Sequence, residues 1–170
     1  MSSFFSSTDS ELTTDRLILR TWSADEVTAV VNGARSAYWA DDFPAEGDRV
    51  IAGFISEHPD DTLGEFGHHL IIERDSGLVV GSIGLFWPPS DGILEIGYGV
   101  VDSRHGRGYA TEATRAMVER ALTAPGVHTV SAGVEPTNPA SVRVLEKCGF
   151  QRRSVDEETI RFHITTPLAQ

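Results

Sequence analysis

Alternating apolar and polar side chains predict seven β-strands in this chain. In the stretch LTTDRLILRTW, Leu17 and Leu19 alternate with positions 16, 18 and 20, which is the two-residue period of a strand with one buried face. Similar runs, bounded by turn residues, follow along the chain. The predicted strands lie within residues 12–22, 66–73, 78–86, 93–101, 128–135, 150–155 and 159–165.

Apolar residues three to four positions apart predict four helices. The segment SADEVTAVVNGAR begins with Ser23 and Glu26 at the spacing of a capping box, and Val27, Val30 and Val31 follow at helical spacing. The helices are predicted within residues 23–35 and 46–58, from a glycine-containing turn to about residue 124, and from residue 138 onward; residues 75–77 and 88–92 are predicted turns. The order β-α-α-β-β-β-α-β-α-β-β favours a mixed sheet with helices on both faces.

Length and composition favour one globular domain over residues 1–170, because the chain is 40% hydrophobic and has no internal repeat or low-complexity linker. The N-terminal residues lack the basic and apolar regions of a secretory signal, and no run approaches the roughly 20 apolar residues that span a bilayer. We therefore expect a cytoplasmic protein. Cys148 is the only cysteine, so an internal disulfide and a cysteine-rich zinc site are excluded, and no metal site is predicted.

The charge of the chain is unevenly distributed. The net charge of −11 argues against nucleic acid or an anionic membrane as the main partner. Residues 1–100 carry 5 Lys and Arg against 17 Asp and Glu, whereas residues 101–170 carry 9 against 8. The cations are thus concentrated in the half that contains the glycine turn. Two explanations fit this distribution: the two halves bind groups of opposite charge, or the unevenness arises by chance on an acidic surface.

The stretch HGRGYATEA, residues 105–113, has the features of an anion site. A predicted strand ends just before it and a predicted helix follows it, and the first turn of a helix presents unpaired N–H groups and a positive dipole end. Gly106 and Gly108 let the backbone approach a ligand closely, and Arg104 and Arg107 can add positive charge.

Three kinds of anion site are built on a glycine-containing turn of this sort. A P-loop needs G-x-x-x-x-G-K-[ST], which is absent from the chain. The dinucleotide fingerprint needs a third glycine, but Gly106-x-Gly108 is followed by Tyr109, Ala110 and Thr111, and the motif lies in the second half of the chain. The missing third glycine argues against a nucleotide-dependent oxidoreductase. The third kind of site holds the pyrophosphate of coenzyme A.

Here the sequence resembles the GCN5-related N-acetyltransferase (GNAT) superfamily, whose [RQ]-x-x-G-x-[GA] turn binds that pyrophosphate. HGRGYA matches the motif from its central glycine onward, although His105 replaces the usual Arg or Gln. LTTDRLILR, EIGYGVVDSRHGRGYATEA and VEPTNPASVRVLEKCGF resemble the opening, the centre and the later strand–helix signature of its RimJ/RimL-type branch. The resemblance implies the GNAT fold, an α/β (α+β) architecture with a mixed, mostly antiparallel twisted sheet of about seven strands.

The resemblance also implies a set of residues that bind acetyl-CoA. Along the strand LEIGYGV, Glu95, Gly97 and Gly99 share a face that is bare of large side chains, and the family's pantetheine arm is expected there, pairing with the strand backbone. A backbone N–H near Val100 and Val101 is expected to hold the thioester carbonyl. The expected cofactor-binding residues are Val100, Val101, His105, Gly106, Arg107, Gly108, Tyr109, Ala110, Thr111, Asn138 and Ser141.

Acetyl transfer to an amine needs a proton acceptor and a group that assists the departing thiolate. Glu95 matches the position of a base carboxylate in some family members; the alternatives are a substrate anchor and a solvated strand carboxylate. The usual acid, a Tyr, is replaced by Leu145, and Ser141 matches a serine that the RimJ/RimL-type branch places near the thioester sulfur. Asn138 before Pro139 is in addition a good helix start.

Several other polar or sulfur-containing residues are expected to be structural. His68 and His69 are adjacent on a predicted strand, so they face opposite sides, and one of them could point into a substrate cleft. Cys148, Tyr98 and Met117 are predicted to belong to the core.

The acceptor is an amine that the sequence does not identify. In YWADDFPAEGD, the acidic residues beside Trp39 and Phe43 form either a wall that suits a cationic amine or an ordinary acidic loop with aromatic anchors; they are Asp41, Asp42, Glu46 and Asp48. We expect an acetyl-CoA-dependent N-acetyltransferase of small amines or protein N-termini, with a homodimer as one open oligomeric state. A catalytically weak acyl-CoA-binding module is the alternative.

Overall fold

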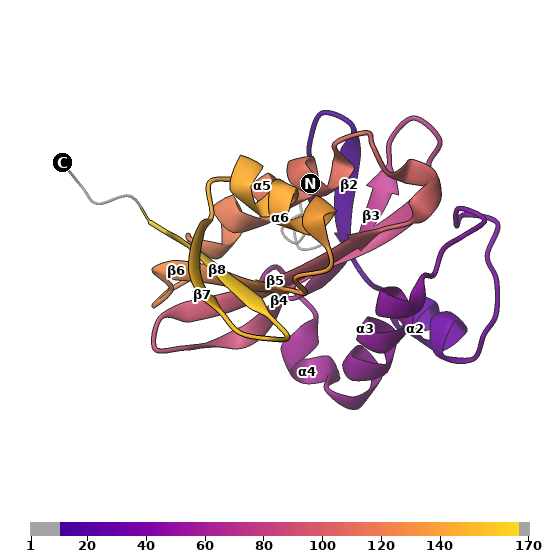
Figure 1. Cartoon of the computed structure of the whole chain (residues 1–170). Coiled ribbons are helices and arrows are strands. Elements are labelled where there is room, and N and C mark those ends of the chain that lie inside the picture. Colours follow the sequence, from indigo (N-terminus) through magenta and orange to yellow (C-terminus); the bar gives the residue numbers. More distant parts are fainter. Residues whose placement is uncertain (1–10, 167–170) are drawn as a thin grey trace.

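Within residues 11–166, eight strands form one continuous sheet in the order β1-β2-β3-β4-β5-β6-β8-β7. The structure is a computed structural model that describes residues 11–166 (Figure 1). Neighbouring strands are antiparallel except β5 and β6, which are parallel. The strands are β1 (Leu12–Thr13), β2 (Leu17–Thr21), β3 (His68–Glu73), β4 (Val79–Ser90), β5 (Ile93–Val100), β6 (Thr129–Val134), β7 (Gln151–Val155) and β8 (Ile160–Thr165).

The expected mixed, mostly antiparallel sheet is confirmed, with differences at three places. The first predicted strand is divided into β1 and β2, which pair with each other. The predicted turn at residues 88–92 is shorter, because β4 continues to Ser90 and only Asp91 and Gly92, both with positive φ, form the turn. A short helix that was not predicted, α4 (Pro59–Thr62), follows the second predicted helix.

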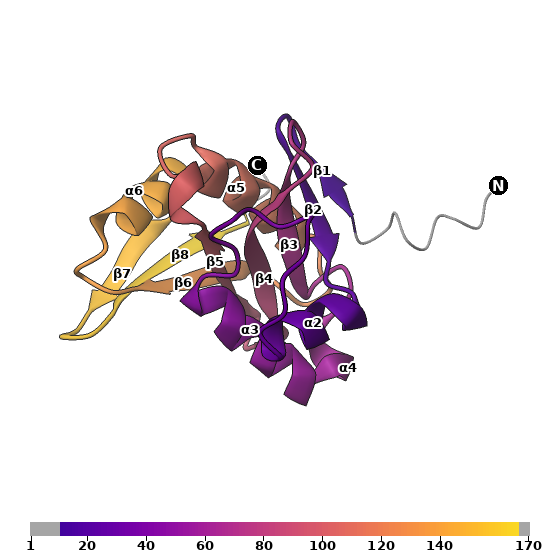
Figure 2. The same ribbon diagram turned by 90° about the vertical axis from the view of Figure 1, so that its right-hand side faces the viewer.

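Helices cover both faces of the sheet, as expected, and Figures 1 and 2 show α5 and α6 on one face and α2, α3 and α4 on the other. The capping box of the first predicted helix is present, since Ser23 and Glu26 each accept a hydrogen bond from the other's backbone N–H. The helices are α2 (Ala24–Val31), α3 (Glu46–Glu57), α4, α5 (Tyr109–Ala121) and α6 (Pro139–Lys147). None in the described part of the chain is long and apolar enough to cross a membrane.

The segment between α2 and α3 is held by buried aromatic rings. Trp39 and Phe43 are 5% and 0% exposed, and their rings pack edge to face at 5.4 Å. Backbone hydrogen bonds join Val79 to Tyr38 and Ala40 on either side of Trp39. These contacts support the alternative in which the segment is an acidic loop with aromatic anchors. Both rings are buried, so neither can contact the amine that accepts the acetyl group.

Strands β5 and β6 separate after three residue pairs. They pair only from Ile93 to Glu95, whereas the other edge of β5 stays paired with β4 up to Val100. The edge of β5 that faces β6 therefore carries no strand partner from residue 96 onward. This gap positions the candidate site, because the glycine turn and α5 begin at its open end (Figure 2).

Candidate active site

A cavity of about 500 Å³ lies between the free edge of β5, the turn that precedes α5, and α6; we call it the α6 cavity. It brings most of the predicted cofactor-binding residues together. Of that set, Val100, His105, Gly106, Gly108, Tyr109, Ala110, Thr111, Asn138 and Ser141 line the cavity. Val101 and Arg107 are not among its lining residues.

The turn before α5 presents a row of open backbone donors. Gly106 and Gly108 both have φ of +81°, a left-handed conformation that favours glycine. Helix α5 begins at Tyr109 without a side-chain cap, and within residues 11–166 no acceptor is found for the N–H groups of Tyr109, Ala110 and Thr111. Unpaired first-turn N–H groups at the positive end of a 13-residue helix form an anion-binding site.

Cations reach the α6 cavity from two sides. Arg104 lines it from the turn, and Arg143 and Lys147 line it from α6. The sequence prediction did not include the two α6 residues, although their i, i+4 spacing puts them on one helix face. Arg107, which was expected to add charge at the anion, does not line the cavity, and like Arg104 it forms an ion pair with Glu73 at 3.1 Å.

Glu73 at the end of β3 fastens the turn to the sheet. Its side chain is 5% exposed. It accepts hydrogen bonds from Arg104 and Arg107 of the turn and from Tyr109 at the start of α5, at 2.7–3.2 Å, and from Ser76 at 2.6 Å. Burial alone would raise the pKa of Glu73, but the hydrogen bonds from Ser76, Tyr109 and Arg104, together with the charge of Arg104, lower this pKa to about 2. The carboxylate is therefore ionised and holds two guanidinium groups beside the anion site.

The free edge of β5 directs alternate backbone groups into the gap. The N–H of Val101 donates to the carbonyl of Val80 at 2.9 Å, so this pair is a hydrogen-bonded pair of the β4–β5 ladder. Such pairs alternate in an antiparallel ladder, and the N–H and C=O groups of Ile96, Tyr98 and Val100 therefore point away from β4. The Val101 N–H is already used within the sheet, which corrects its predicted role and leaves the N–H of Val100.

His105 closes the end of this edge. Its Nε2 lies 2.6 Å from the carbonyl oxygen of Val100. Because a carbonyl only accepts hydrogen bonds, Nε2 carries the hydrogen in this contact. The residue that replaces the family's Arg or Gln thus ties the glycine turn to the last residue of β5.

Tyr98 and Ser141 meet across the α6 cavity. The Tyr98 hydroxyl lies 2.6 Å from Ser141 Oγ, which joins β5 to α6. The prediction that Tyr98 belongs to the core is therefore wrong for its hydroxyl, although its ring packs against the core. Burial raises the pKa of Tyr98, so the hydroxyl keeps its proton at neutral pH. Asn138 caps α6 by accepting the N–H of Ser141 at 3.2 Å.

Glu95 lies where β5 and β6 still pair, outside the residues that line either cavity beside β5. Its side chain is 49% exposed and its Oε2 is 3.7 Å from a guanidinium nitrogen of Arg161 on β8. Glu95 shares a strand face with Gly97, which does line a cavity. A proton moving between Glu95 and that cavity would therefore travel through water.

A second cavity, of about 340 Å³, lies on the opposite side of β5 against α3; we call it the α3 cavity. Tyr98, Gly99 and Val100 line both cavities, so the two meet at the end of β5. Gly97 and Gly99 border the α3 cavity, which places the bare strand face on this side and not along the gap toward β6. Three polar side chains from other elements line the α3 cavity: Asp48 of α3, His68 of β3 and Ser82 of β4.

The remaining predicted residues occupy structural positions. Met117 is fully buried, as expected, and Cys148 is half-buried beside α5. His69 is buried and its Nδ1 lies 3.1 Å from the carbonyl oxygen of Gly67. Within residues 11–166, no three His, Cys, Asp or Glu side chains are grouped so that they could hold a metal ion.

Comparisons with known proteins agree with this geometry. A family model described as an acetyltransferase (GNAT) domain matches residues 16–151. The chain is 32% identical over 99 residues to the Bacillus subtilis (strain 168) protein named Probable N-acetyltransferase YjcK, a match that covers 56% of this chain and 54% of that protein. The chain thus spans about half the length of the curated relatives that it matches first.

Solved structures share the fold. An acetyltransferase from Agrobacterium tumefaciens str. C58 superimposes with a TM-score of 0.66 at 22% identity, covering 92% of this chain and 94% of that one. A dodecameric spermidine N-acetyltransferase from Vibrio cholerae superimposes with a TM-score of 0.62 at 16% identity, covering 89% and 95%.

Replacing Glu73 tests whether its charge fastens the turn. Glu73→Gln leaves two guanidinium groups without their carboxylate, and we expect the free energy of unfolding at pH 7 to fall by about 1–3 kcal/mol. The pKa of Glu73 is lowered from 4.5 to about 2, so the stabilisation is present above pH 4.5 and is lost as the pH falls toward 2. Urea unfolding between pH 7 and pH 2 should therefore show the two proteins converging.

Glu119→Gln, which removes an exposed carboxylate of α5, is the control and should leave stability nearly unchanged. A difference between wild type and Glu73→Gln that stays constant down to pH 2 would contradict the role of the ionised carboxylate.

Proposed function

The chain belongs to the GNAT acetyltransferase family, and on that premise we propose that it is an acetyl-CoA-dependent N-acetyltransferase acting on a primary amine. The observation that carries the proposal is the α6 cavity, where open amides of a helix start meet a free strand edge. The three motifs that resemble the RimJ/RimL-type branch support a place in that branch. We further propose that residues 1–170 act as one acetyltransferase domain.

The residues of the α6 cavity fit coenzyme A. A diphosphate needs several N–H donors and nearby positive charge, and the turn offers the amides of residues 106–111 with Arg104 beside them. Arg143 and Lys147 provide further charge on the opposite wall. Asn138 and Ser141, at the start of α6, face the space between the turn and β5 and can contact the pantetheine arm.

Bound acetyl-CoA would supply the acetyl thioester. Its pantetheine arm is expected along the free edge of β5, where Ile96, Tyr98 and Val100 offer backbone groups as a neighbouring strand would. The N–H of Val100 is the donor for the thioester carbonyl, because the N–H of Val101 is bonded within the sheet. The acyl end then lies at Gly99, where the α3 cavity meets the α6 cavity.

In the transfer, the bond between the amine nitrogen and the acetyl carbon forms, and the bond between that carbon and sulfur breaks. The attacking amine loses one proton, which we assign to Glu95 through water. The departing thiolate gains one proton, which we assign to the Tyr98–Ser141 pair, since both hydroxyls are protonated at neutral pH. The pair takes the place of the family's usual Tyr, which is Leu145 here.

Binding and turnover test the proposal directly. We expect calorimetry to detect acetyl-CoA binding, and we expect free thiol to be released from acetyl-CoA when a panel of primary amines is added. Binding without thiol release for any amine would favour the acyl-CoA-binding module. Absence of acetyl-CoA binding by the folded protein would overturn the proposal.

The Tyr98–Ser141 pair predicts non-additive mutational effects. We expect Tyr98→Phe and Ser141→Ala each to lower kcat about tenfold. The double variant should be no slower than Ser141→Ala alone, because each change breaks the same proton donor pair. Tyr38→Phe, which alters a tyrosine that is 74% exposed, is the matched control. Effects that simply multiply in the double variant would count against the pair.

The role of Glu95 is tested by Glu95→Gln. If Glu95 receives the proton, kcat should fall about 100-fold or more and the pH–rate profile should change its shape. Glu135→Gln, an exposed carboxylate that follows β6, should leave both unaltered. An unchanged profile in Glu95→Gln would exclude the base role.

A further inference from the structure

His68 is a buried imidazole without a hydrogen-bond partner. It is 2% exposed and lines the α3 cavity, and within residues 11–166 neither ring nitrogen makes a hydrogen bond. Leaving a buried polar group unpaired costs about 1–3 kcal/mol. Each unpaired buried group in a native protein calls for an explanation, and a missing ligand is one.

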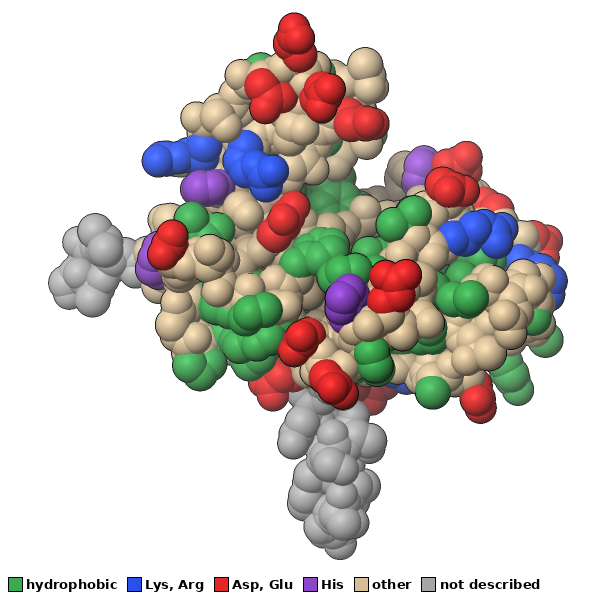
Figure 3. All heavy atoms as spheres, turned by 90° about the horizontal axis from the view of Figure 1, so that it is seen from below, with side chains coloured by type: hydrophobic (Ala, Val, Ile, Leu, Met, Phe, Trp, Pro, Cys, Tyr) green, Lys and Arg blue, Asp and Glu red, His purple; other side chains and the backbone are tan. Residues whose placement is uncertain are grey.

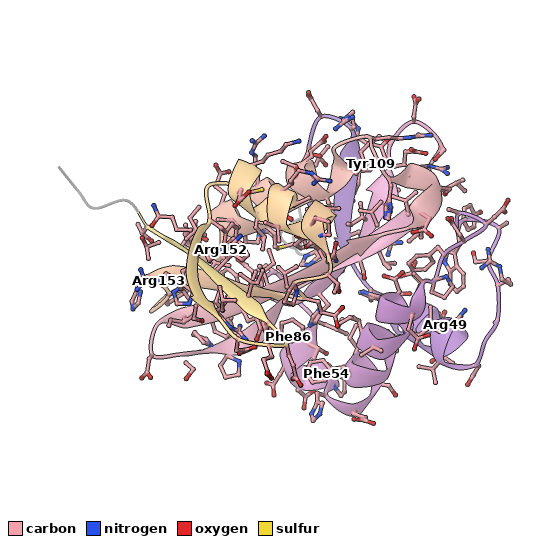
Figure 4. All side chains as sticks on the ribbon, in the orientation of Figure 1. Arg49, Phe54, Phe86, Tyr109, Arg152 and Arg153 are labelled. Carbon is pink, nitrogen blue, oxygen red and sulfur yellow. The ribbon has the colours of Figure 1, made fainter. Side chains whose placement is uncertain are left out.

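The surroundings of His68 keep the ring at the cavity. A Cβ atom on Gly84 would lie 2.1 Å from His68 Nδ1, so only glycine leaves room for the imidazole. The ring centroid of Phe86 lies 4.8 Å from that of His68, and the ring centroid of Phe54 lies 6.1 Å from it. Figure 4 shows Phe54 and Phe86 together on the α3 side of the sheet, with Tyr109 of the turn on the other side.

The protonation state of His68 suits an acceptor of hydrogen bonds. Burial, together with the neighbouring His69, lowers the pKa of His68 to about 4. The ring is therefore neutral at physiological pH and carries a free lone pair on one nitrogen. A primary amine has N–H groups to donate to that lone pair in both its charged and its neutral form.

Asp48 is the carboxylate of the α3 cavity, and both of its oxygens are already engaged. One accepts the backbone N–H of Ala45 at 2.8 Å and the other accepts the Ser82 hydroxyl at 2.5 Å. Burial raises the pKa of Asp48, although these hydrogen bonds and the charge of Arg49 oppose the shift. Because Asp48 is 4% exposed and burial disfavours its charged form, it is poorly suited to bind a second ammonium group.

Apolar atoms form much of the rest of the wall, from Val50, Ile51 and Ile83. Figure 3 shows the face that bears α3 and α4, where hydrophobic side chains gather toward the middle and acidic side chains lie both among and around them. The net charge of −11 on the whole chain attracts cationic amines at long range.

We propose that the α3 cavity binds a primary monoamine with an apolar body, and that His68 accepts a hydrogen bond from its amino group. The inference rests on the proposed function and names the acceptor class of that same site. The amine reaches the acyl end at Gly99 and Val100, the residues that the two cavities share. Among the lining residues, a polyamine finds no carboxylate for its second charge other than the buried Asp48.

The substrate class is tested with two acceptors, phenethylamine and spermidine, each titrated at saturating acetyl-CoA. We expect kcat/KM for phenethylamine to exceed that for spermidine at least tenfold. Equal values, or a preference for spermidine, would overturn the assignment of an apolar monoamine.

The role of His68 is tested with His68→Phe and His68→Gln. Phenylalanine keeps an aromatic ring beside Phe86 but has no lone pair, so KM for phenethylamine should rise about tenfold, or about 1.4 kcal/mol. Glutamine can accept a hydrogen bond and should restore most of the affinity. His58→Gln, an exposed histidine whose ring also packs against Phe54, is the matched control and should leave KM unchanged.

Calorimetry with acetyl-CoA separates this inference from the proposed function. We expect the Kd for acetyl-CoA to be the same in wild type and in all three variants. Tight acetyl-CoA binding with an unchanged phenethylamine KM in His68→Phe would overturn the role of His68 and leave the proposed function standing. A wild-type protein that binds no acetyl-CoA would overturn the proposed function. If His68→Phe does not fold, His68→Met, which has no nitrogen lone pair, takes its place: a tenfold rise in the phenethylamine KM supports the role, and an unchanged KM contradicts it.

Discussion

The separation of β5 from β6 after Glu95 is the constraint on which the site depends. A strand edge left without a partner exposes N–H and C=O groups that need hydrogen bonds, and proteins normally pair or cover such edges. In this chain the turn before α5 and the start of α6 flank the open edge without adding a strand to it, and His105 of the turn bonds to the Val100 carbonyl at its end. The parting strands thus create a cavity with polar backbone on one wall and a helix start at its end.

The turn must hold its conformation while its amides stay unpaired. Left-handed glycines at positions 106 and 108 set the backbone, and they offer no packing of their own. Contacts from outside provide the rigidity: Glu73 binds the side chains of Arg104, Arg107 and Tyr109, and His105 binds Val100. The same arginines keep positive charge near the amides, so one buried carboxylate serves both geometry and electrostatics.

Local patterns predicted the sheet and most helices because they depend on neighbouring residues. The capping box of Ser23 and Glu26 and the turn at Gly77 are examples, since both are formed within five residues. Alternation also gave the correct face for Tyr98. Whether that face is fully covered depends on α6, some forty residues later, and the hydroxyl meets Ser141 at a position that no local pattern shows.

Long-range pairing explains the other differences. Glu73 and Arg107 lie 34 residues apart in the chain, and their contact exists because the end of β3 reaches the turn. His68 and His69 were expected to be structural, with one of the two able to point into a cleft. Which one does so depends on the face of β3 that meets α3, and His68 lines the α3 cavity. The four-residue helix α4 is too short to show a period in the sequence.

The alternation of β5 accounts for the way in which the two cavities meet. Residues 96, 98 and 100 aim their backbone groups at the gap, as the ladder with β4 requires. The intervening residues 97 and 99 are glycines. The face of β5 that borders the α3 cavity therefore has no side chain at these positions to close that cavity. A ligand on the edge of β5 and a ligand on its bare face are then separated by little more than the strand backbone at Gly99.

A side chain at position 99 would fill open space, since no atom lies within 4 Å of a Cβ built there. Glycine at that position therefore keeps a passage open and is not required by packing.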